Sequence, residues 1–173
     1  MRYVALFRGI NVGGKTTVRM ERLRELLSDL GFGNVRSYIQ SGNVAVDSDD
    51  PEESIEARIY ESFEREFFRT PVMVRSIDSI RDAVDANPFA NEEFEDKQMH
   101  LVFLSEAMND EKAAFLLSHN NETESFSVRG REVYCLLRAG VADSLLGKKF
   151  IDNKLKIAAT GRNWRTVKTL LTL

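Results

Sequence analysis

The chain has 173 residues, with 24 Lys and Arg against 27 Asp and Glu, and a formal net charge of −3. Its 43% hydrophobic and 29% charged residues argue against a disordered chain, and no apolar run approaches the roughly 18 residues of a membrane span. The lone Cys135 excludes an internal disulfide framework and is typical of a reducing compartment, so we expect a cytoplasmic protein.

Hydrophobic periodicity predicts a first set of strands and helices in the N-terminal part of the chain. The expected elements, in chain order, are a strand at 3–7, a helix at 20–30, a hairpin at 35–46 that turns at 41–43, a helix that starts at 50–53, and a strand at 71–74. This βαββαβ order predicts a ferredoxin-like α+β subdomain over residues 1–76.

The remainder of the chain repeats this order after a connecting helix and loop at residues 77–96. The expected elements are strands at 100–104, 124–128, 133–137 and 155–159, and helices at 110–117, 141–152 and 162–171. They predict a second, similar α+β subdomain over residues 97–173, closed by a C-terminal helix. Thr160 is the expected N-cap of that helix, and Trp164 is expected to be buried and to anchor it.

Charge is strongly segregated along the chain. Residues 1–46 carry a net charge of +4, residues 47–124 of −14, and residues 125–173 of +7. A basic C-terminal third can attract polyanions such as nucleic acid or phosphate-bearing ligands. The alternative is that the basic segments form ion pairs with the acidic middle of the chain.

The segment GINVGGKT at residues 9–16 formally matches a P-loop, in which a lysine neutralises phosphate and a threonine holds magnesium. The context does not fit, because the helical period begins only at Met20 and the next two strands form a hairpin. A weaker hypothesis remains, in which glycine N–H groups beside Arg8 and Lys15 form an anion nest. The alternative is an ordinary flexible connection.

Candidate catalytic and metal-binding groups are few. His100 and His119 lie 19 residues apart without neighbouring cysteines, so no metal site is expected, and both are interpreted as structural. Cys135 lies in an apolar strand and is interpreted as an inert core thiol. Ser41 lies in a turn and not in a nucleophile elbow, and the strand at 43–46 lacks the aromatics of an RNA-recognition motif.

Five ordered motifs carry a resemblance to a known family: LFRGINVGGK (6–15), YIQSGNV (38–44), NPF (87–89), RGREVY (129–134) and TGRNWRTV (160–167). From residue 3 to the C-terminus the chain resembles a bacterial family, domain of unknown function family 1697. The resemblance implies an α+β fold of two subdomains, one of them ferredoxin-like, and brings no activity or catalytic residue.

The chain departs from the family pattern at four positions: Thr16 where Asn is common, Arg19 for Pro, Leu145 for Lys, and Arg165 for Asn. The first departure indicates that the P-loop match is accidental. The missing lysine at Leu145 weakens any role for a Ser–Lys pair at Ser144.

Three functional hypotheses follow. The first is a binding module for an anionic, phosphate-bearing ligand such as a nucleotide or nucleic acid, with the candidate ligand-binding residues Arg8, Asn11, Gly13, Gly14, Lys15, Ser41, Asn43, Arg162, Asn163 and Arg165. The second is a small metal-independent enzyme whose polar cleft residues are Arg8, Asn11, Ser41, Asn43 and Asn163. The third is a structural or protein-interaction module. In the last helix, Arg162, Arg165 and Lys168 are expected to form a basic strip that holds an anion or pairs with the acidic middle. No cofactor, metal or membrane partner is expected, and catalytic residues are left unassigned.

Overall fold

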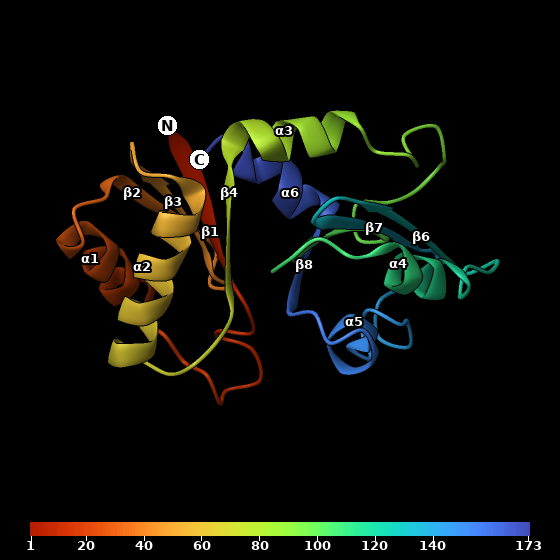
Figure 1. Cartoon of the computed structure of the whole chain (residues 1–173), viewed down its shortest axis with the longest axis horizontal. Helices are drawn as coiled ribbons and strands as arrows, with labels where there is room; N and C mark the ends of the chain where they lie inside the picture. Colours follow the sequence, from red (N-terminus) through yellow and green to blue (C-terminus); the bar gives the residue numbers. More distant parts are fainter. The chain divides into compact units, whose positions relative to one another are not determined.

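The computed structural model describes all residues 1–173 and divides the chain into two compact units (Figure 1). Unit 1 consists of Met1–Asp82 and Thr169–Leu173, and unit 2 consists of Ala83–Lys168. Each unit is built on one four-stranded antiparallel sheet, so the predicted α+β class is confirmed. No helix in the chain combines the length and apolar character that crossing a membrane requires.

Unit 1 runs β-α-β-β-α-β, as the periodicity predicts. Its elements are β1 (Arg2–Phe7), α1 (Met20–Asp29), β2 (Gly33–Tyr38), β3 (Asn43–Asp47), α2 (Glu52–Glu66) and β4 (Val72–Ser76). The strands lie in the order β2-β3-β1-β4, and β1 pairs antiparallel with both neighbours. The helix α3 (Ile77–Asp85) then carries the chain from unit 1 to unit 2.

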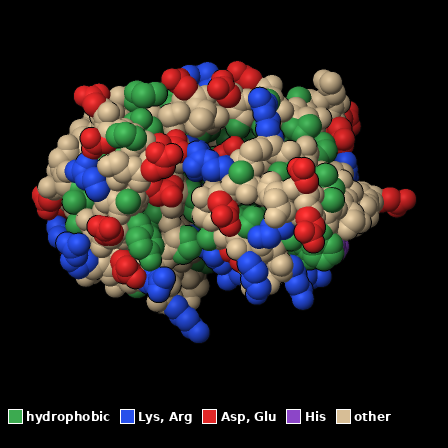
Figure 2. All heavy atoms as spheres, viewed as in Figure 1, with side chains coloured by type: hydrophobic (Ala, Val, Ile, Leu, Met, Phe, Trp, Pro, Cys, Tyr) green, Lys and Arg blue, Asp and Glu red, His purple; other side chains and the backbone are tan.

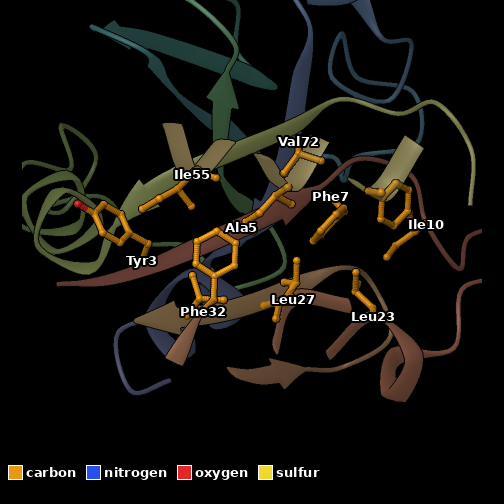
Figure 3. Packing of buried hydrophobic residues seen from close by; sticks show 14 of the residues in the cluster. Tyr3, Ala5, Phe7, Ile10, Leu23, Leu27, Phe32, Ile55 and Val72 are labelled. Carbon is orange, nitrogen blue, oxygen red and sulfur yellow. The ribbon is translucent and has the colours of Figure 1, made fainter. Parts of the chain in front are cut away.

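The core of unit 1 lies between the sheet and its two helices. Alternate residues of β1 point to this face, where Figure 3 shows Tyr3, Ala5 and Phe7 beside side chains of α1 and α2. Leu23 and Leu27 supply the stripe of α1, and both are fully buried. The helical spacing that predicted each helix is therefore the spacing that buries one of its faces.

Unit 2 repeats the element order of unit 1. Its elements are β5 (Met99–Leu104), α4 (Asp110–Leu117), β6 (Glu124–Arg129), β7 (Glu132–Leu137), α5 (Phe150–Lys154) and β8 (Ala159–Asn163). The helix α6 (Trp164–Leu170) follows, and its residues from Thr169 onward belong to unit 1. The strands lie in the order β6-β7-β5-β8, which is the unit 1 order with each strand replaced by its counterpart. Its core includes Val102, Val133, Cys135 and Ile151.

The helix predicted at 141–152 is wrong over most of its length. Residues 138–149 form turns, and α5 begins only at Phe150. Gly140 and Lys149 have φ of 91° and 55°, values that a right-handed helix cannot include. The Ser144 hydroxyl donates to the Val141 carbonyl at 2.6 Å and accepts from the Gly147 amide at 3.1 Å. These side-chain hydrogen bonds, together with backbone turn bonds such as the one from the Ser144 amide to the Val141 carbonyl at 3.1 Å, take the place of a continuous helix.

The last strand and helix are shifted from their predicted positions. The strand predicted at 155–159 lies at Ala159–Asn163, where it pairs with β5, and the helix begins at Trp164 instead of residue 162. Thr160 is therefore in the strand and is not the helix cap. The side chain of Asn163 caps α6, because its Oδ1 accepts from the Thr166 amide at 2.9 Å. The predicted burial of Trp164 is confirmed, since 7% of it is exposed.

Several ion pairs join the basic segments to the acidic middle of the chain. In unit 1, Arg2 pairs with Asp47 at 2.9 Å and Arg22 with Glu66 at 2.6 Å. In unit 2, Lys168 pairs with Asp96 at 3.1 Å, and Arg138 pairs with Glu92. At these positions the segregated charges neutralise one another, as the alternative interpretation of the sequence expected.

Candidate functional site

The glycine-containing loop between β1 and α1 is a closed structure rather than a loose connection. The Asn11 amide donates to the Thr16 carbonyl at 2.8 Å, and the Thr16 hydroxyl donates to the Gly9 carbonyl at 2.6 Å. Gly13 and Gly14 have φ of 68° and 74°, which residues with a Cβ rarely adopt. The glycines therefore let the chain turn back and close on itself within six residues.

The side chain of Asn11 ties this loop to the β2–β3 turn. Its Nδ2 donates to the Gln40 carbonyl at 2.7 Å, and its Oδ1 accepts from the Val18 amide at 2.7 Å. The backbone of Asn11 is itself left-handed, with φ of 56°. Both ends of the carboxamide have backbone partners, so this candidate ligand-binding residue serves to hold the loop in place.

The β2–β3 turn packs directly against the loop at Gly42. Its carbonyl accepts from the Phe7 amide at 2.9 Å, and its φ is 83°. A Cβ at this position would lie 2.8 Å from Cγ1 of Ile10 and 2.9 Å from Cβ of Phe7. The turn predicted at 41–43 is confirmed, and both the left-handed backbone of Gly42 and the close approach of Ile10 favour glycine here.

Asn43 and Ser41 shape the same turn. Asn43 is fully buried, and its Nδ2 donates to the Tyr38 carbonyl at 3.2 Å and to the Ser41 hydroxyl at 3.3 Å. A buried side chain with internal partners has a structural role. The structure thus brings Asn11, Ser41 and Asn43 together as the framework around the loop.

Arg8 joins the base of the loop to the two residues that precede β4. Its backbone amide donates to the Pro71 carbonyl at 3.1 Å, and its carbonyl accepts from the Thr70 hydroxyl at 2.7 Å. Its side chain is half-buried, whereas that of Lys15 at the loop tip is exposed.

The exposed tip of the loop is made of two turns. Residues 10–11 and 13–14 form hydrogen-bonded turns, and the backbone N–H groups of Gly13 and Gly14 have no hydrogen-bond partner in the chain. Val12, Gly13, Gly14 and Lys15 are exposed, and Lys15 adds a positive charge. Successive N–H groups in a turn can converge on an anion.

The same geometry argues against nucleotide hydrolysis by this loop. The Thr16 hydroxyl, which would hold magnesium in a P-loop, donates to Gly9, and the helix begins five residues after Lys15. No group of three or more His, Cys, Asp and Glu side chains in the chain is arranged to hold a metal ion. The loop therefore lacks the parts that activate a phosphate for transfer.

The remaining candidate residues lie in unit 2, and the structure corrects their placement. Arg162 is in β8 and buried, with its guanidinium donating to the Thr160 hydroxyl at 2.7 Å. Burial lowers the pKa of Arg162 to about 10. The predicted basic strip on one helix face is therefore wrong at Arg162, while Arg165 is exposed on α6. Asn163 is occupied as the cap described above.

The other reactive groups have structural surroundings. Burial raises the pKa of the Cys135 thiol, which agrees with an inert core cysteine. The Ser144 hydroxyl is occupied in the 138–149 turns, as described above.

One feature of unit 2 was not predicted from the sequence. The rings of Phe115, His119 and Phe150 form a surface cluster, with centroid distances of 4.8 to 5.6 Å. Phe115 and His119 are four residues apart in and just after α4, so they share a helix face, but nothing local connects them to Phe150. The sequence therefore indicated only that Phe115 and His119, four residues apart, could lie on one helix face.

Two antiparallel sheets with the same strand order define a two-unit α+β protein. The chain belongs to the DUF1697 family, which is described as a protein family of unknown function. The match to this family covers residues 1–134. The resemblance drawn from the sequence motifs is thereby confirmed, although the match ends before the motif at 160–167.

Among solved structures, the chain is similar to a conserved bacterial protein from Streptococcus pneumoniae. The TM-score is 0.79 at 22% sequence identity, over 99% of this chain and 97% of that chain. At this level of identity the likeness concerns the fold alone. No curated protein matches the chain.

Proposed function

We propose that the protein is a binding module for a phosphate-bearing small molecule, such as a nucleotide, which binds at the tip of the loop at residues 11–16. The observation that carries the proposal is the pair of unpaired backbone N–H groups of Gly13 and Gly14, which precede Lys15 in the exposed loop. Backbone donors held in place need little reordering when an anion binds, which favours affinity.

The framework around the loop supports this assignment. Asn11, Thr16 and Gly42 fix the loop through contacts that leave its tip exposed. In such a site the amides bind the phosphate oxygens and the lysine supplies the charge.

The test is a titration followed by ¹⁵N–¹H NMR with inorganic phosphate, AMP and ATP. We expect the amide signals of residues 12–15 to shift with saturation, and Lys15→Gln to weaken binding about tenfold. Arg36→Gln is the matched control, because Arg36 is an exposed cation of unit 1 on β2. Unshifted loop amides at millimolar ligand, or equal weakening by both variants, would contradict the proposal.

A protein-interaction module is the second candidate, and exposed apolar side chains favour it. Val12 is 63% exposed and Ile39 is 51% exposed, and Asn11 hydrogen-bonds the loop of the first to the turn of the second. Ile39 also has φ of 50°, which a β-branched residue rarely adopts. Replacing Val12 and Ile39 with Ser distinguishes the candidates, since phosphate binding should survive the change and protein capture should not.

We also infer that each unit has the ferredoxin-like arrangement. The support is the βαββαβ order in both units, together with strand orders that place the first and third strands at the centre of each sheet. The reduced, buried Cys135 supports a cytoplasmic location.

A further inference from the structure

We propose that the surface formed by α4 and α5 in unit 2 binds single-stranded nucleic acid, with aromatic rings stacking on bases and lysines contacting phosphates. This site is separate from the loop at residues 11–16, and its argument does not rest on the function proposed for that loop.

The rings form a supported platform. Phe150 packs on the core of unit 2 and lies 5.6 Å from Phe115 and 4.8 Å from His119, measured between ring centroids. The Nδ1–H of His119 donates to the Phe115 carbonyl at 2.8 Å, which fixes that ring relative to α4. Phe115 is nonetheless 49% exposed. An aromatic side chain held by its neighbours but half open to solvent is suited to stacking on a base.

The charge beside this platform is net positive, because residues 148–156 carry four lysines against the single acidic residue Asp152. Lys148, Lys149, Lys154 and Lys156 are all exposed, and none of them forms an ion pair. In the same unit, by contrast, Lys97 pairs with Glu95 at 2.9 Å, and Lys168 pairs with Asp96. Figure 2 shows Lys and Arg side chains gathered along the lower edge of the part that contains α5.

The lysines and the rings belong to one surface. Lys149 directly precedes Phe150, and Lys154 lies four residues after it on α5, so Phe150 and Lys154 share a helix face. The first turn of α4 carries Asp110 and Glu111, so the positive charge of this surface comes from α5 and its flanking residues.

A single strand is the occupant that matches both halves of this surface. The phosphates of a single strand repeat at each nucleotide, so several lysines can each contact one. Its unstacked bases expose flat faces on which the aromatic rings can stack. In a duplex the bases are already stacked on each other, and an acidic protein segment offers charge without flat aromatic faces. We therefore expect a preference for single strands over both.

The test is fluorescence anisotropy of the full chain with labelled dT12, rU12 and a 12-base-pair duplex at 50 and 200 mM salt. We expect tighter binding to one or both single strands than to the duplex, with affinity that falls as salt rises. Comparison of dT12 with rU12 identifies DNA or RNA as the source of the strand.

Two variants separate stacking from charge. Phe115→Ala should weaken single-strand binding about fivefold to tenfold at an unchanged salt slope, and Phe115→Trp should retain binding. Lys149→Gln with Lys154→Gln should lower the slope of log affinity against log salt by about 1.4, or about 0.7 for each lost contact. The matched control is Lys97→Gln with Lys168→Gln, which removes two lysines that are already paired.

Four results would overturn the proposal: no single-strand binding at 50 mM salt, equal affinity for the duplex, an unchanged affinity in Phe115→Ala, or competition by polyglutamate as strong as by unlabelled dT12. Arg36→Gln, at an exposed cation of β2 outside both proposed sites, should leave oligonucleotide binding unchanged. The loop is tested separately by the amide shifts of residues 12–15 with inorganic phosphate, so failure of the loop and failure of this surface appear in different measurements.

Discussion

The two units have the same strand order, but the second helix that packs on the sheet differs greatly in length between them. In unit 1 the second helix, α2, has 15 residues and buries Ile55, Ile59 and Phe63. Its counterpart in unit 2, α5, has five residues and buries Ile151. Both sheets nonetheless pair in the same order. Strand order therefore tolerates a large change in the covering helix, and the shortened helix leaves room for the lysine-bearing turns of unit 2.

In both units, a carboxylate of the second helix accepts a hydrogen bond from a backbone amide of an edge strand. In unit 1, the carboxylate of Glu56 accepts from the Val74 amide of β4 at 2.8 Å, and Glu52 accepts from Ser76 at 3.3 Å. In unit 2, Asp152 of α5 accepts from the Ala159 amide of β8 at 3.3 Å. The second helix of each unit thus supplies an acceptor to an edge strand, whose outward N–H groups would otherwise be open to another strand.

The largest expected effects come from truncating one buried aromatic ring in each unit. Phe63→Ala in unit 1 and Trp164→Ala in unit 2 should each lower the free energy of unfolding by about 3–5 kcal/mol, because each leaves a cavity. Urea unfolding followed by far-UV circular dichroism measures both. A Trp164→Ala protein that unfolds at the wild-type midpoint would show that α6 is not anchored by this ring.

The hairpin glycines of the two units should respond differently to alanine. Gly42→Ala should destabilise by about 2–4 kcal/mol, because the new Cβ meets Ile10 and Phe7 as well as a left-handed backbone. Gly130 occupies the equivalent turn with φ of 58° and no atom near its Cβ position, so Gly130→Ala should cost about 1 kcal/mol. Equal losses in thermal unfolding would mean that the contact of Gly42 with Ile10 does not matter.

Removal of the edge-strand acceptors should have a smaller effect. Glu56→Ala and Asp152→Ala should each destabilise by about 1 kcal/mol, since each leaves a strand amide without its carboxylate partner. Glu53→Ala is the control, because Glu53 is exposed in the first turn of α2. Chemical denaturation of the three variants gives the comparison, and a loss in Glu53→Ala equal to the others would discount the hydrogen bonds to the edge strands.

Acid should lower the free energy of unfolding through a buried histidine of unit 2, whereas unit 1 contains no histidine. Burial lowers the pKa of His100 below its usual value near 6.5, and its Nδ1 has no hydrogen-bond partner. The unfolded chain therefore binds a proton at a higher pH than the folded chain does. Stability should be constant above pH 6.5 with respect to this group and should fall as the pH drops below it. His100→Leu should reduce that slope between pH 7 and 5, with His119→Gln as the control.

Unit 1 was predictable almost throughout. The leucines of α1, the start of α2 at 50–53 and the turn at Gly42 all carry their information within a few residues. Such signals survive folding because the same local pattern sets both the element and its buried face. The glycine loop was also recognisable, but its closure by Asn11 and Thr16 depends on contacts that spacing does not reveal.

The segment from 138 to 163 was the least predictable. Its apolar residues at 141, 145 and 146 have helical spacing, which favoured a helix that the structure does not contain. The Leu145 amide donates to Glu124 of β6 at 3.0 Å, a partner 21 residues away. Pairing with β5 likewise places the last strand at Ala159–Asn163 and withdraws Arg162 from the surface.

The sequence by itself determined the α+β class, the repeated element order, the family resemblance, and the burial of Trp164 and Cys135, because each depends on the composition or on neighbours within one or two turns. Tertiary structure alone decided that Asn11 hydrogen-bonds the backbone of Gln40 and Val18, that Asn43 is fully buried, and that Arg162 is buried in a strand. It also brought Phe150 beside Phe115 and His119. These outcomes depend on pairs of groups distant in the chain, whose meeting is set by strand pairing and core packing.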